Sequence, residues 1–508
     1  PVVLDGTHLT LLQLVSIARQ RAKVQLAADA IAKVKLARGA VESRLGSGET
    51  FDGINTGFGA LAAVRIPDQQ LKQLQVNLIR SHACGVGEPL SVEVVRAVMV
   101  LRLQTMLRGN SGVREDTLRQ MEFFLNENIH PVIPSQGSVG ACGDLAPLAH
   151  LALALIGEGV VEWNGSTHSA AVVLQNLNRP ALQPEAKEGL SLINGTQVMT
   201  AIGLLSLATA SDLMCSADIT LAMSLDATMG TATAFRPEIQ SVRPHAGQIK
   251  SASNMRRVLA DDGLRLSHAG CKKVQDPYSF RCAPQVHGAA RNAYSHVLET
   301  LLIEANSSTD NPLVFTETNE ILSGGNFHGE PVAMVLDYLA IAIAEIASIS
   351  ERRIDKLVNP HMSGLPAFLM KDSGLNSGFM IPHVVAASLV SENKIHCHPA
   401  SVDTIPTSAE QEDHVSMGMA SALKLQRVLK NTSRVLAIEA LAAAQGLEFH
   451  NPLQGGMGVR AAHQFIRSRS PALNCDRALA TDIETVAESI FSGEFRKHVE
   501  QLLGELET

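Results

Sequence analysis

The segment GSVGACGDLAPLAH, residues 137–150, places Ala141, Cys142 and Gly143 directly before Asp144. A cysteine among so many small residues could be a nucleophile, a metal ligand, a packed side chain or a group that is chemically modified. A catalytic thiolate needs a nearby histidine or a helix N-terminus, and the nearest histidine in the sequence is His150. This segment alone leaves the role of the cysteine open.

Five further motifs occur along the chain: GINTGFG (53–59), LINGTQ (192–197), VQDPYSFRCAPQ (274–285), SGGNFHGEP (323–331) and TSAEQEDHVSM (407–417). Together with residues 137–150, they resemble the histidine and aromatic amino acid ammonia-lyase family, over roughly residues 5–500. In that family an Ala-Ser-Gly tripeptide cyclises autocatalytically to 4-methylidene-imidazol-5-one. The resemblance implies that Ala141-Cys142-Gly143 forms this electrophile, with no dissociable cofactor and no catalytic metal.

The chemistry of cyclisation accounts for the residue types. The Gly143 amide nitrogen must attack the Ala141 carbonyl carbon, which requires small residues and a strained turn. The middle residue must then lose its heteroatom to leave an exocyclic methylidene. Loss of hydrogen sulfide from Cys142 gives the same electrophile as loss of water from the family's usual serine. We therefore interpret Cys142 as a cofactor precursor, with an uncyclised tripeptide as the alternative.

The position before GINTGFG is a second departure from the family pattern. The family carries a tyrosine there, assigned as the base that removes the β-proton, and this chain carries Asp52. An aspartate is shorter than a tyrosine, and its reference pKa is about 4 rather than about 10. We expect Asp52 to be a poor base unless burial raises its pKa and a water bridges the gap. The alternative is a solvated loop aspartate.

Other site residues follow from the resemblance, residue by residue. Asn194 matches the amide donor beside the electrophile, although an Asn-Gly pair also suits an ordinary turn. Tyr278 matches a proton-handling tyrosine, and Arg281 matches the arginine that binds the substrate carboxylate through a fork of donors. Gln275 and Phe327 match pocket-lining positions. Core packing or a surface ion pair would be the ordinary role for such residues singly.

His82 and Glu412 bear on the substrate. His82 matches a histidine that contacts an imidazole, and Glu412 matches its acidic partner, although a glutamate in the first turn of a helix is also expected from the helix dipole. The neighbouring Glu410 replaces an amide common in the family. The resemblance implies non-oxidative elimination of ammonia from L-histidine, which gives urocanate. The alternatives are an aryl-alanine ammonia-lyase or aminomutase, a catalytically silent amino-acid-binding variant, and a structural helical oligomer.

Composition favours a globular protein that acts on a small molecule. The chain has 508 residues, 45% hydrophobic residues and a net charge of −8, with no basic cluster to bind nucleic acid or an anionic membrane. The seven cysteines are scattered and form no CxxC pair, which favours a reducing compartment and hence a cytoplasmic location. The N-terminal residues lack the order of a signal peptide, and we expect no membrane association.

The periodicity of apolar residues predicts an all-α protein. Helical spacing occurs at 69–84, 92–109 and 114–128, and longer helices are expected at 196–234, 330–357 and 408–446. The last of these opens with the capping-box pattern Thr407-x-x-Glu410. Asn164-Gly165 predicts a minor β-hairpin.

These elements predict a loop-rich helical domain over 1–190 that carries the electrophile, and an elongated bundle of long helices over 191–508. Long helices rich in small residues have too little side-chain volume to form a hydrophobic core within one subunit, so we expect them to be buried against other subunits. We expect an oligomer for this reason, and the family resemblance implies a homotetramer with shared active sites.

Overall fold

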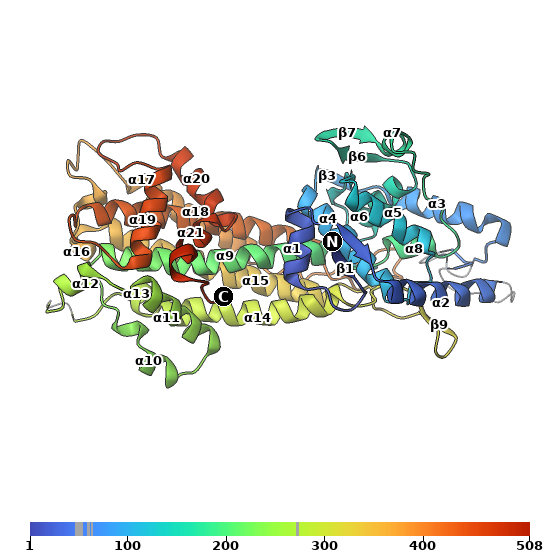
Figure 1. The fold of residues 1–508 in the computed structure, drawn as a ribbon, viewed down its shortest axis with the longest axis horizontal. Coiled ribbons are helices and arrows are strands. Elements are labelled where there is room, and N and C mark those ends of the chain that lie inside the picture. Colours follow the sequence, from blue (N-terminus) through green and yellow to red (C-terminus); the bar gives the residue numbers. More distant parts are fainter. Residues whose placement is uncertain (46–53, 58–60, 62–63, 271–273) are drawn as a thin grey trace. The chain divides into compact units, whose positions relative to one another are not determined.

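The computed structural model describes residues 1–45, 54–57, 61, 64–270 and 274–508. In this part of the chain the structure is mostly helical, with a few small sheets, which confirms the all-α expectation (Figure 1). Asp52 lies outside the described residues.

The structure divides into two compact units, each built from several chain segments. Unit 1 comprises Pro1–Leu205, Leu298–Leu336 and Pro399–Leu423. Unit 2 comprises Ser206–Val297, Asp337–His398 and Lys424–Thr508. These units are the parts of the chain with the most internal contacts, and each combines several segments. The domain boundary expected at residues 190–191 stays a prediction.

Unit 1 holds the predicted short helices at their predicted places, as α3 (Leu71–His82), α4 (Val92–Leu107) and α5 (Glu115–Asn126). Its other helices are α1 (Leu11–Arg19), α2 (Ala28–Leu45), η2 (Asp68–Gln70), α6 (Leu145–Leu155), α7 (Ala170–Asn176) and α8 (Glu188–Ile193). Its strands are β1 (Val2–Leu4), β2 (Val24–Leu26), β3 (Val86–Pro89), β4 (His130–Pro131), β5 (Pro134–Gln136), β6 (Val160–Trp163), β7 (Ser166–Ser169), β8 (Leu313–Phe315) and β9 (Glu320–Leu322).

The predicted hairpin is present as β6 and β7, which pair antiparallel with Trp163 opposite Ser166. Asn164 and Gly165 between them have φ angles of 51° and 76°. Two successive positive φ angles are what a type I′ turn requires, so the Asn-Gly signal is confirmed. β4 pairs with β6 and completes a small three-stranded sheet.

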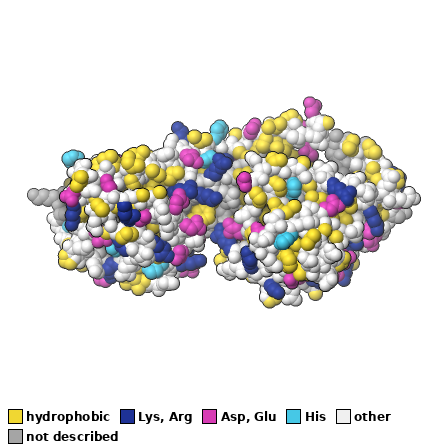
Figure 2. All heavy atoms as spheres, turned by 90° about the horizontal axis from the view of Figure 1, so that it is seen from above, with side chains coloured by type: hydrophobic (Ala, Val, Ile, Leu, Met, Phe, Trp, Pro, Cys, Tyr) yellow, Lys and Arg dark blue, Asp and Glu magenta, His cyan; other side chains and the backbone are white. Residues whose placement is uncertain are grey.

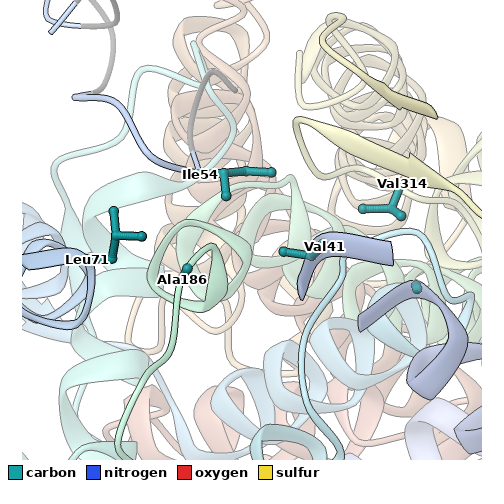
Figure 3. Close-up of a cluster of buried hydrophobic side chains, with 6 residues drawn as sticks. Val41, Ile54, Leu71, Ala186 and Val314 are labelled. Carbon is teal, nitrogen blue, oxygen red and sulfur yellow. The ribbon is translucent and has the colours of Figure 1, made fainter. Parts of the chain in front are cut away.

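A buried hydrophobic cluster in unit 1 supports the segment that follows Asp52. Val41 of α2, Leu71 of α3 and Val314 of β8 meet around Ile54, the second residue of GINTGFG (Figure 3). Ile54 is 1% exposed, so this hydrophobic contact fixes the described part of the motif. Ile66 and Leu74 pack against the same cluster and also line the cavity described below.

Unit 2 contains the main lengths of the long helices α9 (Gln197–Ala227), α14 (Ala283–Ala305), α15 (Glu330–Val358) and α18 (Gly418–Glu448) (Figure 1). Its shorter helices are η3 (Thr233–Phe235), α10 (Pro237–Ser241), α11 (Ala246–Val258), α12 (Gly263–Ser267), α13 (Tyr278–Arg281), α16 (Pro360–Ser363), η4 (Ala367–Leu369), α17 (Met380–His396), α19 (Met457–Arg469), α20 (Ala480–Phe491) and α21 (Glu494–Leu503).

Buried polar networks tie the long helices together. The fully buried Glu439 of α18 accepts a hydrogen bond from Arg353 Nη2 of α15 at 2.9 Å and from Ser224 Oγ of α9 at 2.7 Å. Asp218 of α9 likewise accepts from Arg291 Nη2 of α14 at 2.7 Å. Because an unpaired buried charge is costly, each pair specifies how its helices face one another.

Three details of the long-helix prediction were wrong. α9 ends at Ala227 rather than near residue 234, and α14 was not predicted as a long helix. α18 begins at Gly418, so the capping-box pattern at Thr407 does not start it.

α9 and α15 are each long and apolar enough to cross a membrane by length and composition. In the structure 83% and 67% of their most apolar windows are buried, as in the core helices of a soluble protein.

Candidate functional site

The glycine-rich loop at 137–144 is held by the segment that leads into α18. Gly140 has a φ of 70°, and a side chain there would meet Ser416 Oγ at 2.1 Å. Ser416 Oγ donates to the Gly140 carbonyl at 3.1 Å, and the Met417 amide donates to the Val139 carbonyl at 2.9 Å. The close approach of the two segments therefore requires glycine at this position.

The LINGTQ segment holds the other side of the loop. Gly143 forms an isolated parallel bridge with Gly195, and the Asp144 amide donates to the Gly195 carbonyl at 2.7 Å. A Cβ atom on Gly143 would lie 2.1 Å from that carbonyl oxygen, at a φ of 70°. The third residue of the tripeptide can therefore only be glycine.

Asp144 fastens the tripeptide to the start of α9. Its Oδ2 accepts from the amides of Val198 and Met199, each at 2.9 Å, and its Oδ1 accepts from Ser138 Oγ at 3.0 Å. Burial raises the pKa of the Asp144 carboxyl to about 6, against the opposing effect of these hydrogen bonds. The carboxylate caps a helix N-terminus, where negative charge is favoured.

Cys142 and Glu412 are in contact although 270 positions separate them. The thiol Sγ lies 3.3 Å from Glu412 Oε1, and Thr407 Oγ1 donates to Glu412 Oε2 at 2.9 Å. Thr407 and Glu412 also exchange two backbone hydrogen bonds, at 2.9 Å and 3.2 Å. Glu412 thus lies in a tight loop, and its expected place in a first helical turn was wrong.

That loop contains an unusual backbone run. Ser408, Ala409 and Glu410 have φ angles of 52°, 53° and 68°, in the left-handed region that favours glycine and asparagine. Successive left-handed residues are costly, and they persist here because the Thr407–Glu412 bridge closes the loop around them.

His82 ends α3, and its ring is half-buried. Its Nδ1 lies 2.9 Å from the Leu78 carbonyl oxygen. A carbonyl can only accept, so Nδ1 carries the proton and Nε2 is left as an acceptor in the neutral ring. Burial lowers the pKa of His82, while the bond to Leu78 and the charge of Glu412 act in the opposite direction.

Asn194 follows α8 and is fixed through its backbone and its amide nitrogen. The buried Arg102 donates from Nη1 to the Asn194 carbonyl at 2.6 Å, and Asn194 Nδ2 donates to the Asn311 carbonyl at 3.1 Å. Asn194 Oδ1 is buried and has no hydrogen-bond partner in the part of the chain that the structure describes. Such an acceptor is available to a group that the linear tripeptide does not supply.

One cavity of about 820 Å³ brings most of these side chains together in unit 1. Of the predicted site residues, the following line it: His82, Ala141, Cys142, Asn194, Phe327 and Glu412. Gly143 follows Cys142 in the same loop.

The sequence prediction missed three residues that line this cavity and one that supports it. His328 and His414 stack with ring centroids 5.8 Å apart and line the cavity, as does Asn311. His328 lies within SGGNFHGEP and His414 within TSAEQEDHVSM, so the motifs contained the signal. Arg102 reaches the site from the mostly apolar helix α4, where a buried charged residue is itself a signal.

Two of the remaining predicted residues line a different cavity, of about 620 Å³ in unit 2. Gln275 and Arg281 line it, and the Arg281 guanidinium lies 4.7 Å from the Tyr278 ring centroid. Tyr278 itself is 71% exposed. An exposed tyrosine stacked on a cationic side chain is available to another surface or ligand. Within one chain, these residues and Cys142 belong to separate units.

The residues around Cys142 fit a cyclised electrophile. Ala141 and Gly143 are the small residues that ring closure needs, and the left-handed φ of Gly143 bends the chain at the site of closure.

Comparison with known proteins agrees with this geometry. Residues 9–468 match the family model for aromatic amino acid lyases. The histidine ammonia-lyase of Myxococcus xanthus (strain DK1622) is 50% identical over 497 residues, covering 97% of each chain. That of Symbiobacterium thermophilum is 51% identical over 503 residues, covering 99% of each.

Solved structures extend the similarity to the fold. Histidine ammonia-lyase from Trypanosoma cruzi superimposes with a TM-score of 0.92 at 44% identity, covering 99% of this chain and 96% of that one. Tyrosine aminomutase from Streptomyces globisporus gives 0.95 at 37% identity, covering 100% of both chains. With matches over this length, the chain belongs to the aromatic amino acid lyase family, whose members include carbon–nitrogen lyases acting on histidine.

Proposed function

We propose that the protein eliminates ammonia from L-histidine without oxidation and releases urocanate. The observation that carries this proposal is the contact of Cys142 with Glu412 in a cavity also lined by His82 and Asn194. Glu412 and His82 Nε2 offer acceptors to an imidazole, and phenylalanine would leave the carboxylate without a partner. The most similar relatives support the same substrate.

Ala141, Cys142 and Gly143 would form the 4-methylidene-imidazol-5-one group, held by Asp144, Gly195 and Ser416. The methylidene is an electrophile that converts the substrate amino group into a better leaving group. In this proposal Arg281 binds the substrate carboxylate, Tyr278 assists proton transfer, and Gln275 and Phe327 line the pocket. Asp52 is assigned as the base that removes the β-proton, and we expect it to serve poorly.

We further propose a cytoplasmic homotetramer whose active sites combine the two cavities from different subunits. Two observations support an oligomer. Tyr278 and Arg281 belong to a different compact unit from Cys142. Ile381, Val384 and Val385 of α17 are 58%, 55% and 39% exposed, which is costly for apolar side chains on one helix. Figure 2 shows hydrophobic side chains reaching the surface among charges of both signs.

The direct test is to incubate the purified protein with L-histidine and follow urocanate by absorbance, together with the intact mass of the denatured chain. Cyclisation removes one water and one hydrogen sulfide, so the mass reports the mature fraction independently of turnover. An unmodified mass would overturn the proposed electrophile. A mature protein that neither binds histidine nor forms urocanate would overturn the proposed substrate.

An aryl-alanine lyase or aminomutase is the second candidate, because the chain is also 37% identical to a tyrosine aminomutase over its full length. Chromatography of the products from histidine, tyrosine and phenylalanine separates these activities. Histidine binding in a calorimeter without turnover would identify a silent variant. Light scattering tests the tetramer, which a stable monomer would rule out.

A further inference from the structure

The contact between Cys142 and Glu412 bears on how the electrophile forms, before any substrate is bound. Glu412 Oε1 lies 3.3 Å from the sulfur, while Oε2 is held by Thr407 Oγ1. The two backbone hydrogen bonds between Thr407 and Glu412 fix the start of the side chain. The carboxylate is therefore positioned against the tripeptide by the protein itself.

A second, independent observation concerns Asn194 on the wall of the same cavity. Asn194 is 3% exposed, and none of the described residues donates to its Oδ1. A buried acceptor without a donor is costly; the linear tripeptide gives it none in the structure, and the mature ring has no N–H or O–H to give. A hydroxyl formed on the Ala141 carbonyl carbon during ring closure would supply such a donor.

We propose that Glu412 is a catalytic residue of cyclisation, which transfers the Cys142 Cα proton to the departing sulfur. This inference rests on the proposed formation of the electrophile. In the first step the Gly143 nitrogen bonds to the Ala141 carbonyl carbon, and the carbonyl oxygen leaves as water with the amide protons of Gly143 and Cys142. In the second step Glu412 takes the Cα proton, the Cβ–Sγ bond breaks, and the sulfur leaves as hydrogen sulfide. No oxidant or reductant is needed.

The charge of the carboxylate suits this leaving group. In this contact Sγ is the hydrogen-bond donor and Glu412 Oε1 the acceptor, so the sulfur carries its proton as a thiol. The sulfur can then depart as HS⁻, whereas a thiolate would have to depart as S²⁻. Cα is two covalent bonds from Sγ, so one carboxylate oxygen in contact with the sulfur can serve both atoms in turn.

The test follows maturation rather than turnover. The full chain is synthesised in a cell-free system, and the loss of water and hydrogen sulfide is timed by intact mass. Glu412→Gln keeps the size of the side chain but removes its acid–base function, so we expect maturation to slow by at least about 10²-fold. Asp413→Asn is the matched control, since Asp413 lines the same cavity, and it should mature at the wild-type rate.

Chemical rescue separates acid–base catalysis from a merely structural role. The cavity has room for a small carboxylic acid, so formate should accelerate the maturation of Glu412→Ala at least tenfold and leave Glu412→Gln slow. Circular dichroism checks that each variant is folded.

Three results would overturn the proposal. Glu412→Gln could mature as fast as the wild type, or a folded Glu412→Ala could show no response to formate. A wild-type chain that keeps its unmodified mass would overturn the cyclisation itself. Conversely, slow maturation of Glu412→Gln with formate rescue of Glu412→Ala would uphold this role of Glu412, even for a mature wild type that does not act on histidine.

Discussion

Replacing Asp144 by asparagine tests whether the anchor of the tripeptide loop carries a destabilising buried charge. The carboxyl group is completely buried, and burial raises its pKa from 3.8 to about 6. Asparagine has the same shape, and its oxygen can still accept from the amides of Val198 and Met199. Its amino group can donate to Ser138 Oγ, whose hydroxyl can turn to the Gly143 carbonyl at 3.3 Å. The substitution therefore removes the charge and keeps the hydrogen bonds.

The magnitude follows from linkage. For a carboxyl group whose pKa is higher in the folded protein than in the unfolded chain, the folded state binds more protons between the two pKa values, so stability falls as the pH rises through that window. At about 1.4 kcal/mol per pKa unit, the shift from 3.8 to about 6 lowers the free energy of unfolding by about 3 kcal/mol. This loss of stability is complete above pH 7. Asp144→Asn should then gain at most about 3 kcal/mol at pH 7.5, and about half of that at pH 5.

The assay is denaturant unfolding of wild type and Asp144→Asn at both pH values, reported as free energies of unfolding. Asp144→Ala is the contrasting variant, because it leaves the amides of Val198 and Met199 without an acceptor. Each unsatisfied amide should cost about 1–3 kcal/mol of stability. The reasoning is refuted if Asp144→Asn is less stable than the wild type at pH 7.5, or if its gain is the same at both pH values.

Three further changes have definite expected outcomes. Glu410→Asn should stabilise the protein by about 1 kcal/mol, measured as a higher Tm, because asparagine tolerates the left-handed conformation; Glu410→Gln should show no such gain. Asp52→Tyr should raise histidine elimination, normalised to mature sites, by at least about 10²-fold, whereas Cys142→Ser should change only the yield of mature sites; the reverse pattern would show that Asp52 is an adequate base. Lys187→Met should destabilise the protein by about 3–5 kcal/mol in denaturant unfolding, since it leaves the buried Asp310, 3.2 Å from Lys187 Nζ, without its partner; adding Asp310→Asn should recover most of the loss, and an equally unstable double variant would contradict the ion-pair explanation.

Local sequence patterns determined the helices, the hairpin and the family of this protein. The apolar periodicity of α3, α4 and α5 and the turn at Asn164-Gly165 depend on neighbours within a few positions, so they can be read without a structure. The motifs likewise identified the family and the tripeptide, because small residues next to a removable heteroatom are what cyclisation requires.

The tertiary structure decided which of these residues meet. The capping-box pattern at Thr407 is a local signal, but no helix begins there. The loop that contains it is closed by backbone hydrogen bonds between Thr407 and Glu412, and the Glu412 side chain contacts Cys142. No periodicity links two residues 270 positions apart, since their approach depends on how whole segments pack. The same reason hid the capping of α9 by Asp144. A helix is stabilised by hydrogen bonds between residues close in sequence, so the sequence can predict it. A functional site depends on contacts between residues distant in sequence, which only the folded chain brings together.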